Sequence, residues 1–420
     1  MSSAPPAAAF TSRQKIVVAI LAFLQFTIVL DFMLLSPLGA VLMPALNITP
    51  AQFGLVVSAY AFSAGVSGIL TAGFADRFDR KKLLLVFYGG FLAGTLLCGL
   101  VSTYHGLLLA RMVAGLFAGV VASTSMAIIT DIFPFEMRGR VMGIIQTAFA
   151  ASSVLGIPLA LLLSNHGGWN MPFLLIAGIG VLVGLFIGAS MPAVRGHLAL
   201  HPDRSPLHHF AGTLLNRDYL LGFAATGLLS VGGFMLMPFM SLFTVYNVGI
   251  PVEKLPLMYT LTGVASIVTG PLIGRACDSF GKIRMFMFGC AVTIVMVVIY
   301  THLQPVAFAT LIAVMVVLHV GIFSRMISSS ALLSALPQAT DRGAYMSISS
   351  SLQQMSGGIA AVIAGAIVVQ APDGKLLHFP TLGYALICTT LLTLVLIALV
   401  DRKVRGAGAT LVPGAALASE

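Results

Sequence analysis

The sequence predicts an all-α integral membrane protein with twelve transmembrane helices in two six-helix pseudo-repeats, and its composition is the first reason. Of the 420 residues, 58% are hydrophobic and only 8% are charged. A soluble domain has about 45–50% apolar and about 25% charged residues. Apolar segments also recur along almost the whole chain, each long enough for the roughly 20 residues of a membrane helix. Finally, two short motifs each occur twice at a similar spacing.

The apolar segments are separated by turn-forming clusters such as NITP, SNHGGW and APDG. We expect helices at about 16–43, 50–72, 83–103, 106–130, 139–163, 170–190, 217–246, 254–276, 282–302, 306–335, 343–369 and 378–400. The longest polar connection follows the sixth segment. The predicted organisation is an N-terminal six-helix bundle at 1–190, a cytoplasmic linker at 191–216, a C-terminal six-helix bundle at 217–401 and a cytoplasmic tail at 402–420.

The basic residues predict the orientation of the chain in the membrane. Eighteen Lys and Arg residues lie in the N-terminus, the even-numbered loops and the tail, whereas only Lys254 and Lys375 lie in the odd-numbered loops. Cytoplasmic loops of membrane proteins carry such an excess of positive charge. We therefore expect a multi-pass protein of the bacterial inner membrane with both termini in the cytoplasm. The net charge of +9 follows from this topology, so we expect no nucleic-acid partner.

Asp31 lies deep inside the first apolar segment. A charged side chain at the centre of a bilayer costs about 2.5–3.5 kcal/mol on insertion scales, so Asp31 needs a partner, a proton or a wet cavity. At ~1.5 Å per residue, Asp31 lies about 22 Å from the inner end of its helix, and Arg111 of the fourth helix lies at a matching depth. Two interpretations remain open, a proton-coupling site formed by Asp31 and Arg111 or a permanent ion pair between two helices.

Arg325 is a second charge inside the membrane, in the inner half of the tenth helix. No acidic residue of the C-terminal half has a comparable depth. Arg325 is therefore a candidate for binding an anionic group of a substrate, with structural pairing as the alternative. His319 lies six residues earlier on a different face of the same helix. A lone histidine in an apolar helix is usually packed and hydrogen-bonded, and a role in protonation is the alternative.

Further substrate candidates come from the fifth, seventh and eleventh helices. The eleventh helix begins with the polar stretch SISSSLQQMSGG, which contains Gln354, and Gln146 lies at the related depth of the fifth helix. Polar side chains in membrane helices either line a cavity or hydrogen-bond to a neighbouring helix, and both interpretations remain open. Phe234 and Met237, close to Pro238 in the seventh helix, are candidates for an apolar wall, with ordinary packing as the alternative.

Two pairs of motifs indicate that the halves of the chain are related. AGFADRFDRKK at 72–82 matches GRACDSFGK at 274–282, and RGRVMGI at 138–144 matches RGAYMSI at 342–348. Asp76 precedes Arg138 by 62 residues, and Asp278 precedes Arg342 by 64. Two matches in register imply a six-helix duplication. Repeats of this kind are typical of secondary transporters, which bind their substrates between the halves.

At these residues the chain resembles the major facilitator superfamily. The signature of this family between helices 2 and 3 is G-x-x-x-D-R-x-G-R-[RK]. Asp76-Arg77 and Arg80-Lys81 match it, whereas Ala72 and Asp79 stand where the signature has glycine. Together with the twelve spans and the central loop, the resemblance covers nearly the whole chain.

Within the superfamily the chain looks like the proton-coupled efflux branch of drug and sugar exporters. Asp31 in helix 1 is followed by Pro37, and helix 4 carries the pattern Arg111-x-x-x-Gly115-x-x-x-Gly119. Trp169…Pro172-Phe173 opens helix 6, and the glycine-rich antiporter motif of helix 5 is reduced to Gly156-Ile157-Pro158. The resemblance implies that Asp31 and Arg111 form a pair.

The resemblance also implies a gate on the cytoplasmic face. Asp76 would lie at the N-terminus of helix 11, where a carboxylate meets the positive end of the helix dipole, and Arg80 would lie against Asp131. The alternative is that these charges only set the topology. The gate candidates are Asp76, Arg77, Arg80, Asp131, Arg138, Asp278 and Arg342.

We expect a monomeric secondary active transporter, not an enzyme, that expels a small organic compound such as a drug or sugar in exchange for protons. A proton-coupled organic-anion symporter or a lipid exporter of the same superfamily is the alternative, and a membrane receptor is the alternative from another class. The chain lacks a P-loop, a nucleophile elbow and a zinc-binding helix motif. We therefore expect no cofactor and no metal site, with the proton gradient as the energy source.

Overall fold

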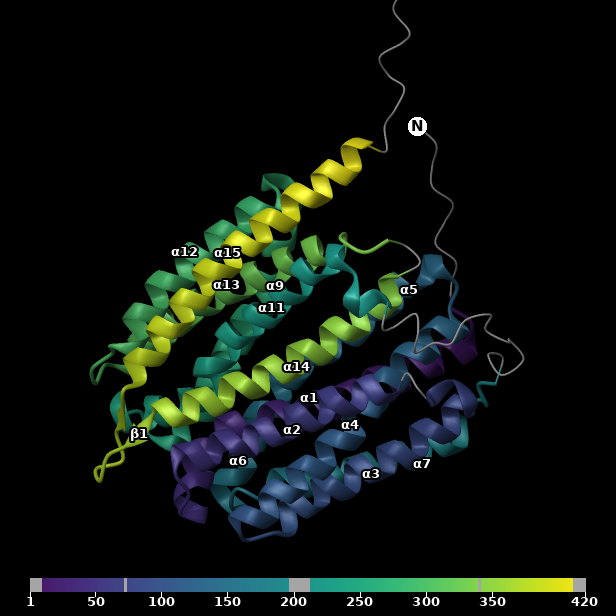
Figure 1. Cartoon of the computed structure of the whole chain (residues 1–420). Helices are drawn as coiled ribbons and strands as arrows, with labels where there is room; N and C mark the ends of the chain where they lie inside the picture. Colours follow the sequence, from purple (N-terminus) through teal and green to yellow (C-terminus); the bar gives the residue numbers. More distant parts are fainter. Residues whose placement is uncertain (1–9, 72–73, 196–211, 339–340, 411–420) are drawn as a thin grey trace, which may run out of the picture.

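The helices form two bundles that follow one another along the chain (Figure 1). The computed structural model describes residues 10–71, 74–195, 212–338 and 341–410. The elements of the N-terminal half are α1 (Ser12–Leu46), α2 (Pro50–Thr71), the 3₁₀ turn η1 (Ala75–Arg77), α3 (Arg80–Leu100), α4 (Tyr104–Ile132), α5 (Phe135–Ala151), the π segment η2 (Ser152–Gly156), α6 (Ile157–Gly167) and α7 (Met171–Ser190).

The C-terminal half has the same helical character. Its elements are α9 (Arg217–Leu236), the 3₁₀ turn η4 (Met237–Phe239), α10 (Met240–Leu242), the π segment η5 (Phe243–Asn247), the 3₁₀ turn η6 (Val252–Lys254), α11 (Leu255–Phe280), α12 (Lys282–Thr301), α13 (Phe308–Leu333), α14 (Arg342–Ile367) and α15 (Phe379–Thr410). A two-stranded antiparallel hairpin, β1 (Val369–Gln370) and β2 (Leu376–Leu377), lies between α14 and α15.

Ten helices of the described residues are long and apolar enough to cross a membrane. The remaining two spans have clear reasons for falling outside this group. The fifth span is divided into α5, η2 and α6, and α14 begins with the polar stretch that contains Gln354. Counting these two, the chain has the predicted all-α membrane fold with twelve spans.

Capping residues determine where the first helix, α1, begins and ends. Thr11 accepts a hydrogen bond from the backbone N–H of Gln14, and the Gln14 side chain accepts one from the Thr11 N–H, which is a capping box. Asn47 ends the helix in the left-handed conformation, with φ of 50°. The helix has 35 residues and is therefore about 52 Å long, which exceeds the ~30 Å hydrocarbon core. Asp31 lies well inside it.

Several details differ from the sequence prediction. The seventh span is interrupted by η4 at Pro238 and by η5, and the fifth by η2 before Pro158. Proline lacks the N–H that an uninterrupted helix requires, so the chain changes its hydrogen-bonding pattern nearby. The last helix continues to Thr410, into the segment predicted as a tail, and the predicted turn APDG is the tip of a hairpin with Gly374 at φ of 86°.

Both ends of the described chain lie at the same end of the bundles, called the termini face below (Figure 1). The other end, which carries the hairpin, is called the hairpin face. The ribbons of the two bundles diverge towards the termini face (Figure 1). Near the hairpin face the halves are joined by hydrogen bonds between α1 and the broken seventh span. Ser241 Oγ donates to Ser36 O at 2.8 Å, and Ser36 Oγ donates to Met237 O.

α2 and α14 form the longest contact between the halves. Glycine allows this approach, because a Cβ on Gly54 would lie only 2.5 Å from the carbonyl oxygen of Ala361. On the other side of the molecule, Val154 of η2 packs on Gly263 of α11. α11 also contacts α6, the part of the fifth span that follows η2. The two halves thus meet along α2 and α14 and, on the α11 side, towards the hairpin face.

Asp79 holds the beginning of the linker against the beginning of α3. Its carboxylate accepts hydrogen bonds from the N–H of Lys81 at 2.9 Å and from the N–H of Val194 at 3.3 Å, and it pairs with Arg195 Nε at 2.7 Å. Burial raises the pKa of Asp79, but the bonds from Arg195, Lys81 and Val194 outweigh it, so this pKa lies below its ordinary value. A glycine in this place, as in the family signature, would make none of these side-chain contacts.

We expect Asp79→Asn to lower the thermal unfolding midpoint of the detergent-solubilised protein at pH 7 and to lower it less at about pH 3, which is below the ordinary pKa of an aspartate. A carboxylate whose pKa is depressed by folding stabilises the protein above its unfolded pKa, and this stabilisation is lost as the pH falls through the folded pKa. The control is Asp373→Asn, which removes an exposed ion pair with Lys375. An equal loss of stability at both pH values, or an equal loss in the control, would contradict this role.

Candidate functional site

The candidate site is built around an ion pair between Asp31 of α1 and Arg111 of α4. Arg111 Nη1 lies 2.8 Å from Asp31 Oδ2, and the two side chains are 1% and 0% exposed. Nη1 also donates to the backbone oxygen of Asp31 at 3.3 Å. Thr95 of α3 donates to Asp31 Oδ1 at 3.1 Å, so each carboxylate oxygen has a donor. The pairing agrees with the depth estimate, while proton coupling by these residues stays a prediction.

Tyr60 and Cys98 complete the surroundings of Arg111. The guanidinium carbon lies 4.3 Å from the centre of the Tyr60 ring, which is a favourable cation–π position. The Cys98 thiol of α3 lies close to the same guanidinium. Arg111 Nε and the Tyr60 hydroxyl are buried without a hydrogen-bond partner among the described residues. The site therefore keeps unused hydrogen-bonding capacity, which is uncommon for buried polar groups.

The glycines of the helix 4 motif place Tyr60 over Arg111. A Cβ on Gly115 would lie 2.3 Å from Tyr60 O, and one on Gly119 would lie 2.2 Å from Ala64 O. Small residues allow such close backbone approach of membrane helices. The motif thus has two physical parts: its arginine binds Asp31, and its glycines bring α2 against α4.

The π segment of the fifth span packs beside Asp31. Ser152 Oγ donates to Phe26 O at 2.9 Å, and Gly156 lies against the side chain of Leu30, the residue before Asp31. π segments within helices occur frequently at functional sites. The shortened Gly-Ile-Pro motif therefore lies against the helix that carries the acid.

A row of aromatic rings connects the ion pair to the other half of the protein. The Tyr60 ring lies 5.4 Å from the Phe32 ring, and the Phe32 ring lies 5.7 Å from the Phe234 ring of α9. We call Tyr60, Phe32 and Phe234 the aromatic row. The row begins at Arg111 and ends in the C-terminal half. A movement of α1 or α2 would therefore displace a ring that contacts the other half.

Two of the predicted substrate residues, Phe234 and Met237, lie at this interface. The Phe234 ring packs on Gly357 of α14, and Gln354 is half-buried one turn earlier on the same helix. Met237 is half-buried and its backbone oxygen accepts the bond from Ser36. Gln146 belongs to α5, but its side chain lies outside the described residues.

Arg325 and His319 lie on α13 and have separate surroundings. Arg325 is 5% exposed and lies close to the Cys290 thiol of α12. Its Nε has no hydrogen-bond partner, and no carboxylate lies within ion-pair distance of it among the described residues. One guanidinium nitrogen approaches Gly232 of α9, two residues before Phe234. His319 Nδ1 lies 2.7 Å from the Met315 oxygen of its own helix.

The gate candidates lie at the termini face, and the ion pairs described there each join elements of one half. Arg80 Nε lies 3.1 Å from Asp131 Oδ2, which is the pairing that the family pattern implies. Arg138 donates to Phe133 O and Thr130 O, both at 2.9 Å, and so caps the C-terminal end of α4. Arg77, Asp278 and Arg342 are exposed, and the side chain of Asp76 lies outside the described residues.

Sequence reasoning missed Thr95, Tyr60, Cys98 and Phe32. Thr95 had a usable signal, because it lies 15 residues after the start of α3 and thus at about the same ~22 Å depth as Asp31. The others needed knowledge of which helix faces meet. Among the described residues, no three His, Cys, Asp or Glu side chains lie together as metal ligands. The histidines of the linker, His197, His201, His208 and His209, lie outside the described residues.

We expect Arg111→Gln to destabilise the protein strongly, because it leaves the Asp31 charge buried without its cation. Removing one member of a buried pair typically costs about 3–5 kcal/mol in the free energy of unfolding. The double variant Asp31→Asn/Arg111→Gln should unfold at a higher temperature than Arg111→Gln alone, since it removes both charges. Arg275→Gln, at an exposed arginine, is the control. A double variant less stable than Arg111→Gln would contradict this account.

The chain matches a known protein family over almost its full length. The model of the Major Facilitator Superfamily matches residues 21–235 and 222–414. The chain is 26% identical to the MFS-type transporter YceJ of Bacillus subtilis over 268 residues, covering 63% of this chain and 67% of that one. It is 24% identical to a protein of Helicobacter acinonychis named as a probable sugar efflux transporter, covering 69% and 73% of the two chains.

Solved structures show the same fold. A bacterial homologue of the lysosomal transporter Spinster, in an inward-facing and occupied conformation, aligns with a TM-score of 0.68 at 16% identity and covers 96% of this chain and 98% of that one. The nucleoside transporter NupG aligns with a TM-score of 0.70 at 14% identity, with coverage of 92% and 99%. The chain is a membrane-embedded transporter and not an enzyme, and it belongs to the Major Facilitator Superfamily.

Proposed function

We propose that this transporter expels a small organic compound, such as a drug or sugar, in exchange for protons. The observation that carries the proposal is the fully buried Asp31–Arg111 pair, which is joined to the other half by the aromatic row. Ionisable residues inside a membrane commonly belong to ion pathways and proton relays. The similarity to the probable sugar efflux transporter of Helicobacter acinonychis supports export.

Asp31 would be the proton site. A carboxylate beside a guanidinium stays ionised, whereas the same carboxylate without this cation in an apolar environment favours its protonated form. A conformational change that draws α4 away from α1 would therefore load a proton on Asp31, and their return would release it. Arg111 Nε and the Tyr60 hydroxyl have no described hydrogen-bond partner, so both can form new hydrogen bonds during such a movement.

The substrate would bind between the halves beside the aromatic row. Phe32, Phe234 and Met237 provide apolar surface, and Gln354 provides a hydrogen-bonding group, all of them half-buried. A substrate that displaces Phe234 would also displace Phe32, the neighbour of Asp31, and would thereby couple the two sites. Gln146 and His319 are further candidates from α5 and α13.

The termini face would be the cytoplasmic side of a bacterial inner membrane. The excess of Lys and Arg in the loops of this face supports that orientation. The ends of α3, α4 and α5 would move together, because Arg80 pairs with Asp131 and Arg138 binds the end of α4. Asp76, Arg77, Asp278 and Arg342 would then form contacts between the halves when this face closes. A monomer without a bound cofactor, driven by the proton gradient, is sufficient for this cycle.

We expect Asp31→Asn to abolish uphill transport while leaving downhill exchange of substrate, because the amide cannot carry the proton. A thermal-shift screen of drugs, sugars and organic anions at two pH values would first identify a ligand. Proteoliposomes with an imposed pH gradient would then measure its flux. Asp373→Asn is the matched control at an exposed acid of the hairpin, to which no role in transport is assigned. Uphill transport by Asp31→Asn at the wild-type rate would exclude Asp31 as the proton site.

An organic anion is the second candidate substrate, and Arg325 is the observation that favours it. A buried guanidinium without a described carboxylate partner has capacity for an anionic group, and it lies beside Gly232, close to Phe234. Burying such a charge unpaired is unfavourable, so a carboxylate or phosphate of a substrate would stabilise it. The function would then be proton-coupled movement of an organic anion.

We expect organic anions to raise the unfolding temperature of the wild type and of Arg325→Lys but not of Arg325→Gln, because only the first two keep the positive charge. The same compounds with the acidic group esterified should stabilise none of the three proteins. A shift of equal size in Arg325→Gln would exclude Arg325 from anion binding. Such a result would leave the assignment of Asp31 unaffected.

A further inference from the structure

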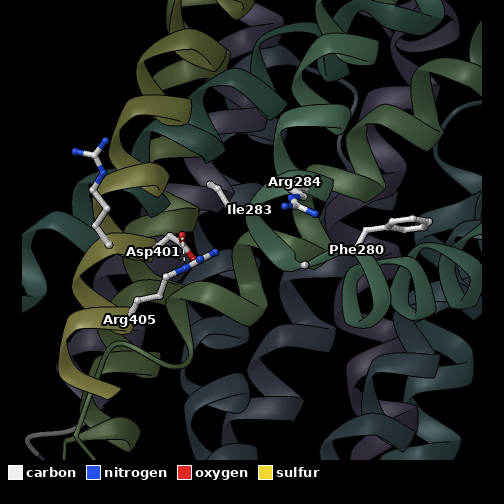
Figure 2. Close-up of a pocket in the computed structure, with 7 residues that line it drawn as sticks. Phe280, Ile283, Arg284, Asp401 and Arg405 are labelled. Carbon is white, nitrogen blue, oxygen red and sulfur yellow. Dashed lines mark ion pairs between the residues drawn. The ribbon is translucent and has the colours of Figure 1, made fainter. Parts of the chain in front are cut away.

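A crevice with a basic rim lies on the termini face between α12 and α15. Its volume is about 510 Å³, and it is lined by the three arginines Arg284, Arg402 and Arg405 together with Phe280, Ile283 and Asp401. Figure 2 shows Arg405 beside Asp401 on α15, reaching towards the side on which Ile283 and Arg284 lie. Gly281, at φ of 93°, makes the sharp turn that brings the beginning of α12 to this place.

The charge of the crevice is not balanced within it. Asp401 pairs with Arg405, whose Nε lies 2.9 Å from Asp401 Oδ2. Arg284 and Arg402 are exposed, and no carboxylate lies within ion-pair distance of either among the described residues. Three guanidinium groups against one carboxylate give the crevice a net charge of +2. Guanidinium groups bind phosphate oxygens with directed, charge-assisted hydrogen bonds.

An apolar groove continues from the crevice into the membrane-spanning part of the same two helices. This groove of about 300 Å³ shares Ile283 and Arg402 with the crevice, and it is otherwise lined by Met287, Val395, Ala398 and Leu399. Met287 lies five residues into α12, about 7 Å from its start. Met287, Val395 and Leu399 are 52%, 59% and 42% exposed. The groove is thus an open apolar recess on the surface, and its end at the crevice is basic.

We propose that the crevice and groove together bind one anionic phospholipid. The phosphate binds in the crevice, where Arg284 and Arg402 supply the positive charge that no described carboxylate compensates, and the first part of an acyl chain occupies the groove beside Met287 and Ala398. Basic pockets between membrane helices recognise anionic lipid head groups. Both parts are needed to specify this ligand. A soluble anion would leave the apolar groove unfilled, and a neutral lipid would leave the positive charge of the two arginines uncompensated. The site is separate from Asp31 and Arg111 and from the interface between the halves.

Native mass spectrometry of the purified full chain tests the proposal, with dioleoyl phosphatidylglycerol and dioleoyl phosphatidylcholine as probes at equal concentration. We expect the wild type to retain phosphatidylglycerol preferentially. Arg284→Ala/Arg402→Ala should weaken that binding about 30-fold, because each arginine near a membrane surface contributes roughly fivefold. Arg284→Lys/Arg402→Lys should retain most of the preference.

Two controls separate the parts of the site. Arg217→Ala/Arg275→Ala removes two exposed arginines elsewhere on the termini face and should leave the lipid adduct unchanged. Ala398→Trp fills the groove while keeping the arginines and should also weaken phosphatidylglycerol binding. Equal retention of the two lipids or an equal loss in the Arg217/Arg275 control would overturn the proposal. Thermal unfolding of each variant confirms that a lost adduct does not reflect a lost fold.

Discussion

The burial of Asp31 with Arg111 constrains the rest of the N-terminal half. Burying two charges inside the protein costs free energy. This cost stays small only if the charges neutralise each other and most of their hydrogen-bonding atoms have partners. The pair therefore requires α1 and α4 at one distance, α3 close enough for Thr95 to reach Asp31, and α2 close enough for Tyr60 to cover Arg111. Gly115 and Gly119 make the last of these approaches possible.

The two halves share a helical plan but differ in chemistry. The N-terminal half encloses an ion pair, whereas the C-terminal half encloses Arg325 close to the Cys290 thiol and without a described carboxylate partner. Irregular helical segments lie against α1 from both halves, η2 beside Leu30 and η4 beside Ser36. Interrupted backbone hydrogen bonding makes such segments suitable places for bending. The helix that carries the acid is thus contacted by an irregular segment from each half.

Part of the candidate site was predictable because depth in a membrane helix follows from counting residues. The fixed rise of a helix placed Asp31 and Arg111 at one level before their contact was known. The same count places Thr95 at this level, but depth is its one signal, because threonine is common in membrane helices. Tyr60, Phe32 and Cys98 could not be chosen, since their roles depend on helix rotation. The interruptions at Ser152–Gly156 and Phe243–Asn247 likewise depend on packing against neighbouring helices.

The sequence by itself determined the number of spans, the grouping of basic residues on one face, the duplication and the presence of three buried charges, Asp31, Arg111 and Arg325. These properties depend on hydrophobicity, charge and length, which each segment carries alone. Only the tertiary structure decided which helix faces meet, that Phe32 and Tyr60 join the ion pair to Phe234, and that α12 and α15 form a basic-ended groove. The physical reason is that lipid is as apolar as a protein core, so a membrane helix is hydrophobic on all sides and its sequence does not reveal which side is buried.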